Sequence, residues 1–205
     1  MKRIEAVLFD LDGVLIDSSE VWFPLLNQVA KDLDYPEITF EQFRAGWGQG
    51  VAADVRDFYP GSTVADIAEE YAKRFGDFKA QLRITEEAAP VFERLQREGL
   101  GVAVVTNTPG TLARSIVQVA GLSPHHVIGA DDVPRAKPHP DMLLEACQRL
   151  QVEPNAALMV GDTSYDRRAA RAAEVDFAIY VGYEDHSIEG GRRITSLSEV
   201  FDRYG

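Results

Sequence analysis

Several polar residues follow short apolar runs of the chain, and their types could bind a cation and a phosphate group. They are Asp10, Asp12, Gly13, Thr106, Asn107, Lys137, Asp162 and Asp166. In an open parallel sheet, ligands bind beyond the carboxyl ends of the strands. If the apolar runs are such strands, these polar residues should converge on one edge of the sheet.

Four of these residues are aspartates, and bringing their carboxylates together is electrostatically costly. Two bare carboxylates ~4 Å apart repel by about 4 kcal/mol at an effective dielectric of 20. Either some of them are protonated or a hard cation lies among them. Clustered oxygen ligands without histidine or cysteine favour Mg²⁺ over zinc, and an open Mg²⁺ site suits a substrate phosphate. The expected metal ligands are Asp10, Asp12, Asp162 and Asp166.

Each residue type indicates a role in this chemistry. Asp10 directly follows an apolar run and can present one oxygen to the metal and the other to phosphorus, as a nucleophile. Asp12 points the same way if the backbone stays extended, which makes it the candidate general acid and base. Thr106 and Asn107 precede a predicted helix N-terminus, which suits a phosphate. Lys137 can neutralise charge on Asp10 and on the transferring group.

The strands that must position these residues are predicted from five apolar runs, at 6–9, 102–105, 127–128, 158–160 and 177–181. Amphipathic helical patterns lie between the later runs, at 86–97, 111–120, 141–150 and 164–173. Near-continuous apolar strands that alternate with helices predict an α/β fold. Its parallel sheet should carry helices on both faces.

Residues 17–83 break this alternation, because they contain helical patterns and no convincing strand. Segments 17–20 and 39–42 match capping boxes, and apolar residues recur at helical spacing. Crossover helices are usually far shorter than this segment, so it needs its own packing surface. We therefore expect a helical insertion over the carboxyl edge of a core formed by residues 1–16 and 84–205.

The composition limits the class of partner. The chain has 205 residues, of which 45% are hydrophobic, and its formal net charge is −12. Nucleic acids and anionic membrane surfaces are bound through clustered Lys and Arg, so neither is an expected partner. No apolar stretch reaches the roughly 20 residues that span a bilayer. A single cysteine, Cys147, excludes an intrachain disulfide, and we expect a soluble cytoplasmic protein.

Four segments of the chain resemble, in order, the four motifs of the haloacid dehalogenase superfamily. They are Asp10-Leu11-Asp12-Gly13-Val14, Thr106-Asn107, Lys137-Pro138 and Gly161-Asp162-Thr163-Ser164-Tyr165-Asp166. The resemblance covers nearly the whole chain and includes a helical cap inserted after the first motif. It implies a Rossmann-like core, a phosphoaspartyl intermediate on Asp10 and a Mg²⁺ requirement. It also implies that the cap closes over a small phosphorylated metabolite.

The superfamily contains several chemistries, and individual residues distinguish them. Dehalogenases lack the second aspartate of the first motif, whereas Asp12 is present here. Mutases of the β-phosphoglucomutase type carry a cap histidine at the position of Trp22, and phosphonatases use a cap lysine as a Schiff base. The resemblance therefore favours a phosphatase similar to the phosphoglycolate phosphatase-like branch. A sugar phosphomutase and a catalytically idle regulatory protein on the same scaffold are the alternatives.

Within the insertion, residues 48–53 match the dinucleotide pattern G-x-G-x-x-A. The pattern follows a predicted helix rather than a strand, so we do not interpret it as a nucleotide site. Residues 44–50 instead predict a loop between cap helices, and such loops carry substrate contacts in the superfamily. Arg44, Trp47 and Gln49 are the candidates for these contacts, although a core tryptophan and a surface arginine would look the same.

Overall fold

The apolar runs of the sequence form a six-stranded parallel sheet within residues 3–183, 188 and 191–203, which a computed structural model describes. The strands are β1 (Ala6–Phe9), β4 (Gly101–Val105), β5 (His126–Ile128), β6 (Ala157–Gly161), β7 (Asp176–Tyr180) and β8 (Arg192–Ile194). Their order is β5-β4-β1-β6-β7-β8. Five of them confirm predicted strands. β8 was not predicted, because two of its three residues are arginines.

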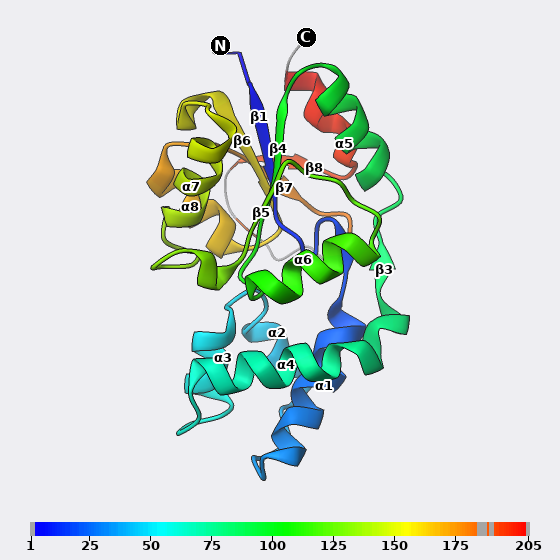
Figure 1. Cartoon of the computed structure of the whole chain (residues 1–205), viewed down its shortest axis with the longest axis vertical. Coiled ribbons are helices and arrows are strands. Elements are labelled where there is room, and N and C mark those ends of the chain that lie inside the picture. Colours follow the sequence, from blue (N-terminus) through cyan, green and yellow to red (C-terminus); the bar gives the residue numbers. More distant parts are fainter. Residues whose placement is uncertain (1–2, 184–187, 189–190, 204–205) are drawn as a thin grey trace.

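Helices cover both faces of this sheet, which confirms the predicted α/β fold (Figure 1). The helices are α5 (Ala88–Arg97), α6 (Gly110–Val119), α7 (Asp141–Leu150) and α8 (Ser164–Ala173). Successive residues of a strand point to opposite faces of the sheet. Ala6 and Leu8 belong to the hydrophobic cluster with α7 and α8, and Val7 and Phe9 belong to the cluster with α5 and α6. The central strand is thus buried on both sides.

Four further helices form a separate region below the carboxyl ends of the strands (Figure 1). They are α1 (Ser19–Asp32), α2 (Phe40–Ala45), α3 (Val51–Asp57) and α4 (Val64–Phe78). The ring of Trp22 on α1 packs against Tyr71 and Phe75 on α4, with ring centroids 5.5 and 6.0 Å apart. This aromatic contact gives the helices a packing surface of their own, and we call α1–α4 the cap.

The expectation that residues 17–83 contain no strand was wrong at both ends. Strand β2 (Ile16–Asp17) pairs antiparallel with β3 (Arg83–Ile84) as the chain leaves and re-enters the core. Two-residue strands carry too few side chains to produce a sequence pattern. The boundaries that we propose between core and cap fall within this strand pair.

The two expected capping boxes had different outcomes. Thr39 and Gln42 form one at the start of α2, which confirms the prediction. The prediction of a capping box at Asp17 was wrong, because Ser18 is the N-cap of α1 and its side chain makes no capping hydrogen bond. The Ser18 hydroxyl instead donates to Asp12 Oδ1 at 2.5 Å. The Ser18 side chain therefore bonds to Asp12 instead of to the backbone of α1.

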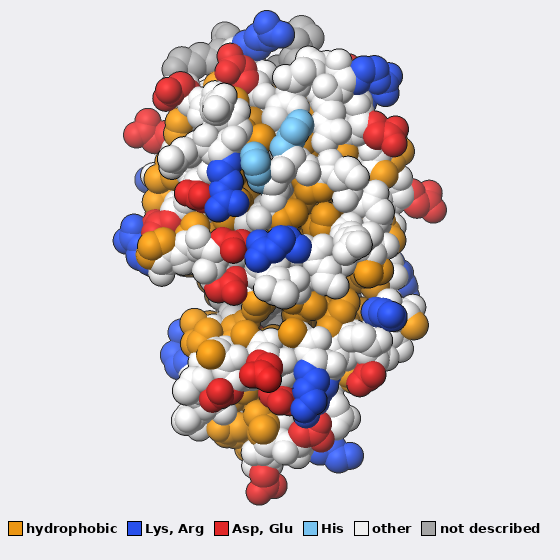
Figure 2. Space-filling model, viewed as in Figure 1, with side chains coloured by type: hydrophobic (Ala, Val, Ile, Leu, Met, Phe, Trp, Pro, Cys, Tyr) orange, Lys and Arg blue, Asp and Glu red, His pale blue; other side chains and the backbone are white. Residues whose placement is uncertain are grey.

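Short 3-10 helices complete the described part of the chain, at Lys79–Gln81, Ala130–Asp132, Pro154–Ala156 and Leu197–Arg203. Figure 2 shows charged side chains of both signs scattered over core and cap, with hydrophobic side chains gathered along the notch between them. Among the residues described, none of the helices is both long and apolar enough to cross a bilayer.

Candidate active site

Asp10 follows β1 directly and lies at the carboxyl edge of the sheet. Its backbone N–H donates to the Val160 carbonyl at 2.9 Å, which continues the β1–β6 ladder by one residue. The Leu11 N–H donates to Asp10 Oδ1 at 2.7 Å. The carboxylate is thus fixed by the backbone at the end of a buried strand, and its residue is only 5% exposed.

Lys137 lies beneath this carboxylate and is fully engaged. Its Nζ is 2.9 Å from Asp10 Oδ1 and 2.6 Å from Asp166 Oδ1, and it donates to the Val105 carbonyl at 2.9 Å. An ammonium group has three hydrogens, so these three acceptors use all of them. Burial lowers the pKa of Lys137, but the carboxylates of Asp10 and Asp166 outweigh it and raise the pKa above its usual range. The ammonium therefore stays charged.

Asp10, Asp162 and Asp166 each place a carboxylate oxygen within 4.8 Å of the others, and all three are buried. Burial and then the charge of Asp166 raise the pKa of Asp10, and Lys137 opposes this only in part. Three ionised carboxylates and one ammonium leave two negative charges without compensation. One divalent cation would neutralise them, and a donor set made of oxygens suits Mg²⁺. The residues present therefore fit the expected metal.

The positions of Asp162 and Asp166 are fixed by their surroundings. Asp162 packs on the backbone of Gly13, where a Cβ would lie 2.1 Å from Asp162 Oδ2. Gly13 also has a φ of +81°, a conformation that glycine adopts without strain. Asp166 lies in the first turn of α8 and forms a capping box with Thr163, whose N–H donates to Asp166 Oδ2 at 3.0 Å. The glycine and the helix cap thus hold two carboxylates against the sheet edge.

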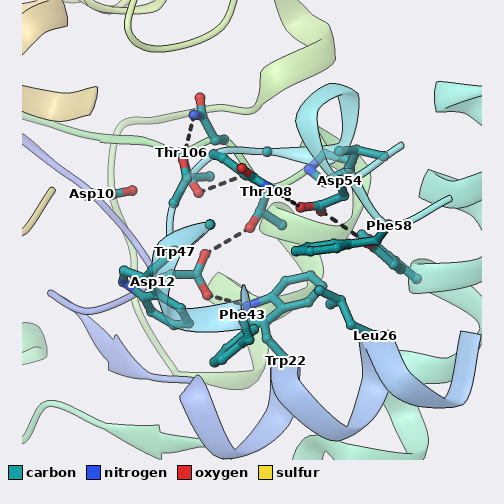
Figure 3. A pocket seen from close by; sticks show the side chains of 18 residues that line it. Asp10, Asp12, Trp22, Leu26, Phe43, Trp47, Asp54, Phe58, Thr106 and Thr108 are labelled. Atoms are coloured by element: carbon teal, nitrogen blue, oxygen red, sulfur yellow. Dashed lines mark hydrogen bonds between the residues drawn. The ribbon is translucent and has the colours of Figure 1, made fainter. Parts of the chain in front are cut away.

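Asp12 is not a member of this carboxylate group. Its Oδ1 accepts from the Ser18 hydroxyl at 2.5 Å and from Trp22 Nε1 at 2.7 Å, and its Oδ2 accepts from the Thr108 hydroxyl at 2.8 Å. Three donors, from the N-cap and first turn of α1 and from the loop after β4, therefore fix this carboxylate on the pocket wall. Figure 3 shows the contacts from Trp22 and Thr108. The expected metal role of Asp12 stays a prediction, and its position suits proton transfer.

Thr106 and Asn107 follow β4 and lie next to the aspartates in the loop before α6. Thr106 Oγ1 accepts from the Thr108 N–H at 3.1 Å, which leaves its hydroxyl hydrogen for a ligand. Asn107 Nδ2 donates to the carbonyls of Lys137 and Gly48, at 3.0 and 2.8 Å. Asn107 Oδ1 is buried and has no hydrogen-bond partner among the described residues, so it is available to a ligand or water.

The loop between α2 and α3, residues 46–50, connects the cap to this edge. Trp47 Nε1 donates to Asp162 Oδ2 at 3.0 Å, and the Gly48 carbonyl accepts from Asn107. A Cβ at Gly48 would lie 2.9 Å from Thr163 Cγ2, and one at Gly50 would lie 3.2 Å from Asn107 Cβ. The glycines therefore allow the cap backbone to approach the core closely.

A pocket of about 630 Å³, open solvent at its mouth included, lies between core and cap. Asp10, Asp12, Thr106 and Asn107 line its core side. Its cap side is formed mainly by aromatic and apolar side chains, among them Trp22, Leu26, Phe43, Trp47 and Phe58. The carboxylates at the sheet edge therefore face a largely apolar cap wall across the pocket.

This geometry agrees with the comparison to known protein families. The family model for haloacid dehalogenase-like hydrolases matches residues 4–174. The chain belongs to this family. The expected family resemblance is thereby confirmed, and the protein is a hydrolase.

Two relatives and one solved structure show how closely this haloacid dehalogenase-like hydrolase matches known proteins. A phosphoglycolate phosphatase of Chromobacterium violaceum is 32% identical over 217 residues, covering 98% of this chain and 97% of that protein. A phosphoglycolate phosphatase of Vibrio parahaemolyticus is 32% identical over 196 residues, covering 88% and 85%. The crystal structure of CbbY from Rhodobacter sphaeroides in complex with phosphate has a TM-score of 0.83, at 25% identity over 96% of each chain.

Two of the three cap residues proposed for substrate contact lie in the hydrolase pocket. Trp47 and Gln49 line it. Arg44 is exposed on α2 and lines a second, smaller pocket with Asp17 and Asp162. Arg44 is not among the residues that line the main pocket.

Asp54 on α3 also lines the pocket, and no pattern in the sequence predicted this position. It is 9% exposed, and burial raises its pKa to about 6. Gln49 Nε2 donates to Asp54 Oδ1 at 2.9 Å, and the Tyr71 hydroxyl donates to Asp54 Oδ2 at 3.0 Å. Asp54 was missed because an aspartate within a helical pattern looks like a solvated residue until the helix is placed.

Proposed function

We propose that this hydrolase is a Mg²⁺-dependent phosphatase that cleaves a small phosphomonoester through a phosphoaspartyl intermediate on Asp10. The observation that carries the proposal is the position of Asp10. It lines the pocket, and both its backbone contact from Leu11 and its ion pair with Lys137 engage Oδ1. This leaves Oδ2 as the oxygen that can attack a phosphorus atom in the pocket.

In the first step, Asp10 Oδ2 forms a bond to phosphorus while the ester P–O bond breaks. The leaving oxygen takes the electron pair of that bond and receives a proton from Asp12. The Thr106 hydroxyl and backbone N–H groups near the start of α6 donate to the phosphate oxygens. Lys137 holds Asp10 in place and compensates part of the negative charge at the sheet edge.

In the second step, a water molecule attacks the phosphorus of the phosphoaspartate and gives its proton to Asp12. The bond between phosphorus and Asp10 Oδ2 breaks, which releases inorganic phosphate and restores both aspartates for another cycle. The contact of the cap loop with Asn107 and Asp162 supports this proposal, because it places the cap over part of the sheet edge where the phosphoaspartate would form.

Asp10, Asp162 and Asp166 would hold the Mg²⁺ ion, which supplies charge neutralisation for the carboxylates and the phosphate. Asp166 Oδ1 is already bonded to Lys137 and its Oδ2 to Thr163. Its contribution can therefore come through one further lone pair of a carboxylate oxygen. Asp12 acts in proton transfer in this proposal.

The mutase alternative receives no support from the cap. Trp22, which occupies the position of the mutase histidine, donates its indole N–H to Asp12. An indole nitrogen is a donor only and cannot exchange protons with substrate as an imidazole can. The names of the relatives make phosphoglycolate the first substrate to test.

The test measures inorganic phosphate released from p-nitrophenyl phosphate, phosphoglycolate and a panel of metabolite esters, with Mg²⁺ and with EDTA. We expect Mg²⁺-dependent release that Asp10→Asn lowers by about 10³-fold or more. The matched control is Asp77→Asn, the same change at an exposed residue of α4, which should retain activity. Mass spectrometry after acid quench should find the phosphoryl group on Asp10. Turnover by Asp10→Asn at the parent rate would exclude this mechanism.

A further inference from the structure

The cap side of the pocket, where the leaving group of a phosphoester would lie, has an unusual charge distribution. Asp10 and Asp54 lie at opposite sides of the pocket (Figure 3). Asp54 is thus the third acidic residue of the pocket lining, after Asp10 and Asp12, and it lies in a cap wall otherwise formed by apolar, aromatic and neutral polar residues. A carboxylate in such a wall is a candidate to bind a group of the substrate.

Asp54 has the capacity to accept further hydrogen bonds. Its Oδ1 and Oδ2 each accept one donor, from Gln49 and from Tyr71. Each carboxylate oxygen has two acceptor positions, so one position on each remains for a ligand. The hydroxyl of Tyr59 lies 3.5 Å from that of Tyr71 and donates to the Leu26 carbonyl, which holds the group in place. A pKa of about 6 supports a mostly ionised Asp54 at neutral pH.

No lysine or arginine among the described residues lines this pocket. Lys137 lies behind Asp10 with all three hydrogens engaged, and Arg44 lines the other pocket. A carboxylate on the leaving group would therefore approach Asp54 without a cation to compensate it. Like charges placed together at a binding interface cost several kcal/mol, which is enough to reject a ligand.

We propose that the leaving group of the natural substrate is an uncharged or cationic alcohol that donates a hydrogen bond to Asp54. This inference rests on the proposed phosphatase function and names its substrate class. The aromatic wall formed by Trp22, Phe43 and Phe58 accommodates an apolar part of the same group. Phosphorylated hydroxy acids, including the phosphoglycolate named for the relatives, are poor substrates, and Asp54 is the residue that discriminates against them.

The experiment compares kcat/KM for two sets of esters that differ only in the terminal group. One set is 2-phosphoglycolate, 2-hydroxyethyl phosphate and phosphoethanolamine. The longer set is 4-carboxyphenyl and 4-hydroxymethylphenyl phosphate. We expect the hydroxyl and ammonium esters to exceed the carboxylates by about tenfold or more. Asp54→Asn should reduce that ratio several-fold, mainly by improving turnover of the carboxylates, whereas the exposed control Asp77→Asn should leave it unchanged.

The outcomes separate this inference from the proposed function on which it rests. If p-nitrophenyl phosphate is hydrolysed in an Asp10-dependent manner and the carboxylate esters are the best substrates, the substrate class is wrong while the phosphatase function stands. The same holds if Asp54→Asn keeps the parent ratio while its thermal unfolding shows an intact fold. If no ester is hydrolysed with Mg²⁺, both are overturned.

Discussion

The sheet edge and the cap wall each bury carboxyl groups, but they compensate them differently. At the sheet edge, Asp10 and Asp166 share the ammonium of Lys137, so their negative charge faces a positive one. In the cap, Asp54 is held by two neutral donors, Gln49 and Tyr71. Burial of the carboxylates at the sheet edge is therefore stabilised by an opposite charge. Burial of Asp54 is stabilised by hydrogen bonds that a neutral side chain could also make. The first arrangement suits catalysis and the second suits selection of a substrate.

Removing the ammonium should produce the largest effect and would test the charge balance directly. Lys137→Met leaves the carboxylates of Asp10 and Asp166 buried without a counterion, which costs about 3–5 kcal/mol of stability. We expect this loss in urea unfolding at pH 7, together with loss of phosphatase activity. The exposed control Lys79→Met should change stability by no more than about 0.5 kcal/mol. Equal stability of the two variants would show that the edge does not depend on Lys137.

Neutralising the cap carboxyl should have the opposite effect on stability, with a pH dependence of known sign. The pKa of Asp54 is about 6 in the folded chain, whereas an unperturbed aspartate has a pKa near 3.8. The folded state thus binds the proton more tightly, so parental stability falls as pH rises from about 4 through 6. Two pKa units correspond to about 3 kcal/mol, so Asp54→Asn should be more stable than the parent at pH 8 by at most this amount.

The measurement is the free energy of unfolding of both proteins at pH 5 and pH 8. The advantage of Asp54→Asn should shrink at pH 5, where the parental carboxyl is mostly protonated. Gln49 can turn its amide so that its oxygen accepts from the new amide nitrogen, which preserves the contact. An unchanged difference between the two pH values would contradict the assigned burial of Asp54.

The smallest expected effect concerns the contact between the two regions at Asp12. Trp22→Phe removes the indole donor to Asp12 while keeping an aromatic ring against Tyr71. We expect kcat/KM for alkyl phosphates to fall about tenfold, the size of one lost hydrogen bond to a charged group. p-Nitrophenyl phosphate should be affected less, because its leaving group departs without protonation. An equal loss for both esters would indicate a structural role for Trp22.

The sheet edge was largely predictable from the sequence. A strand that is buried on both faces appears in the sequence as an apolar run. The polar residue that follows it can therefore be recognised from its position. Asp10 and Asp162 were found in this way, and Lys137 was found in the loop that follows the third predicted strand. The structure places these three residues together at one edge of the sheet. The partners of Asp12 were not found, since Thr108 and Ser18 are small hydroxyl residues that are common in loops and helix caps.

The cap wall was predictable only as a set of helices. Its helices follow the apolar period, but which side chains face the pocket depends on how α1, α3 and α4 are placed relative to the core. Asp54 and Tyr71 are separated by 17 residues and meet only through that placement. Helical spacing does not report the angle between two helices, so neither their contact nor the charge of the wall could be derived.

The chain contains two tryptophans, and both indole N–H groups donate to aspartates at the junction of core and cap. Its tryptophan fluorescence therefore originates entirely beside the reacting groups. Emission from Trp47 would respond to separation of the loop from Asp162, and emission from Trp22 would follow Asp12. The protein thus contains an optical reporter for each half of its own reaction centre, with no dye or label required.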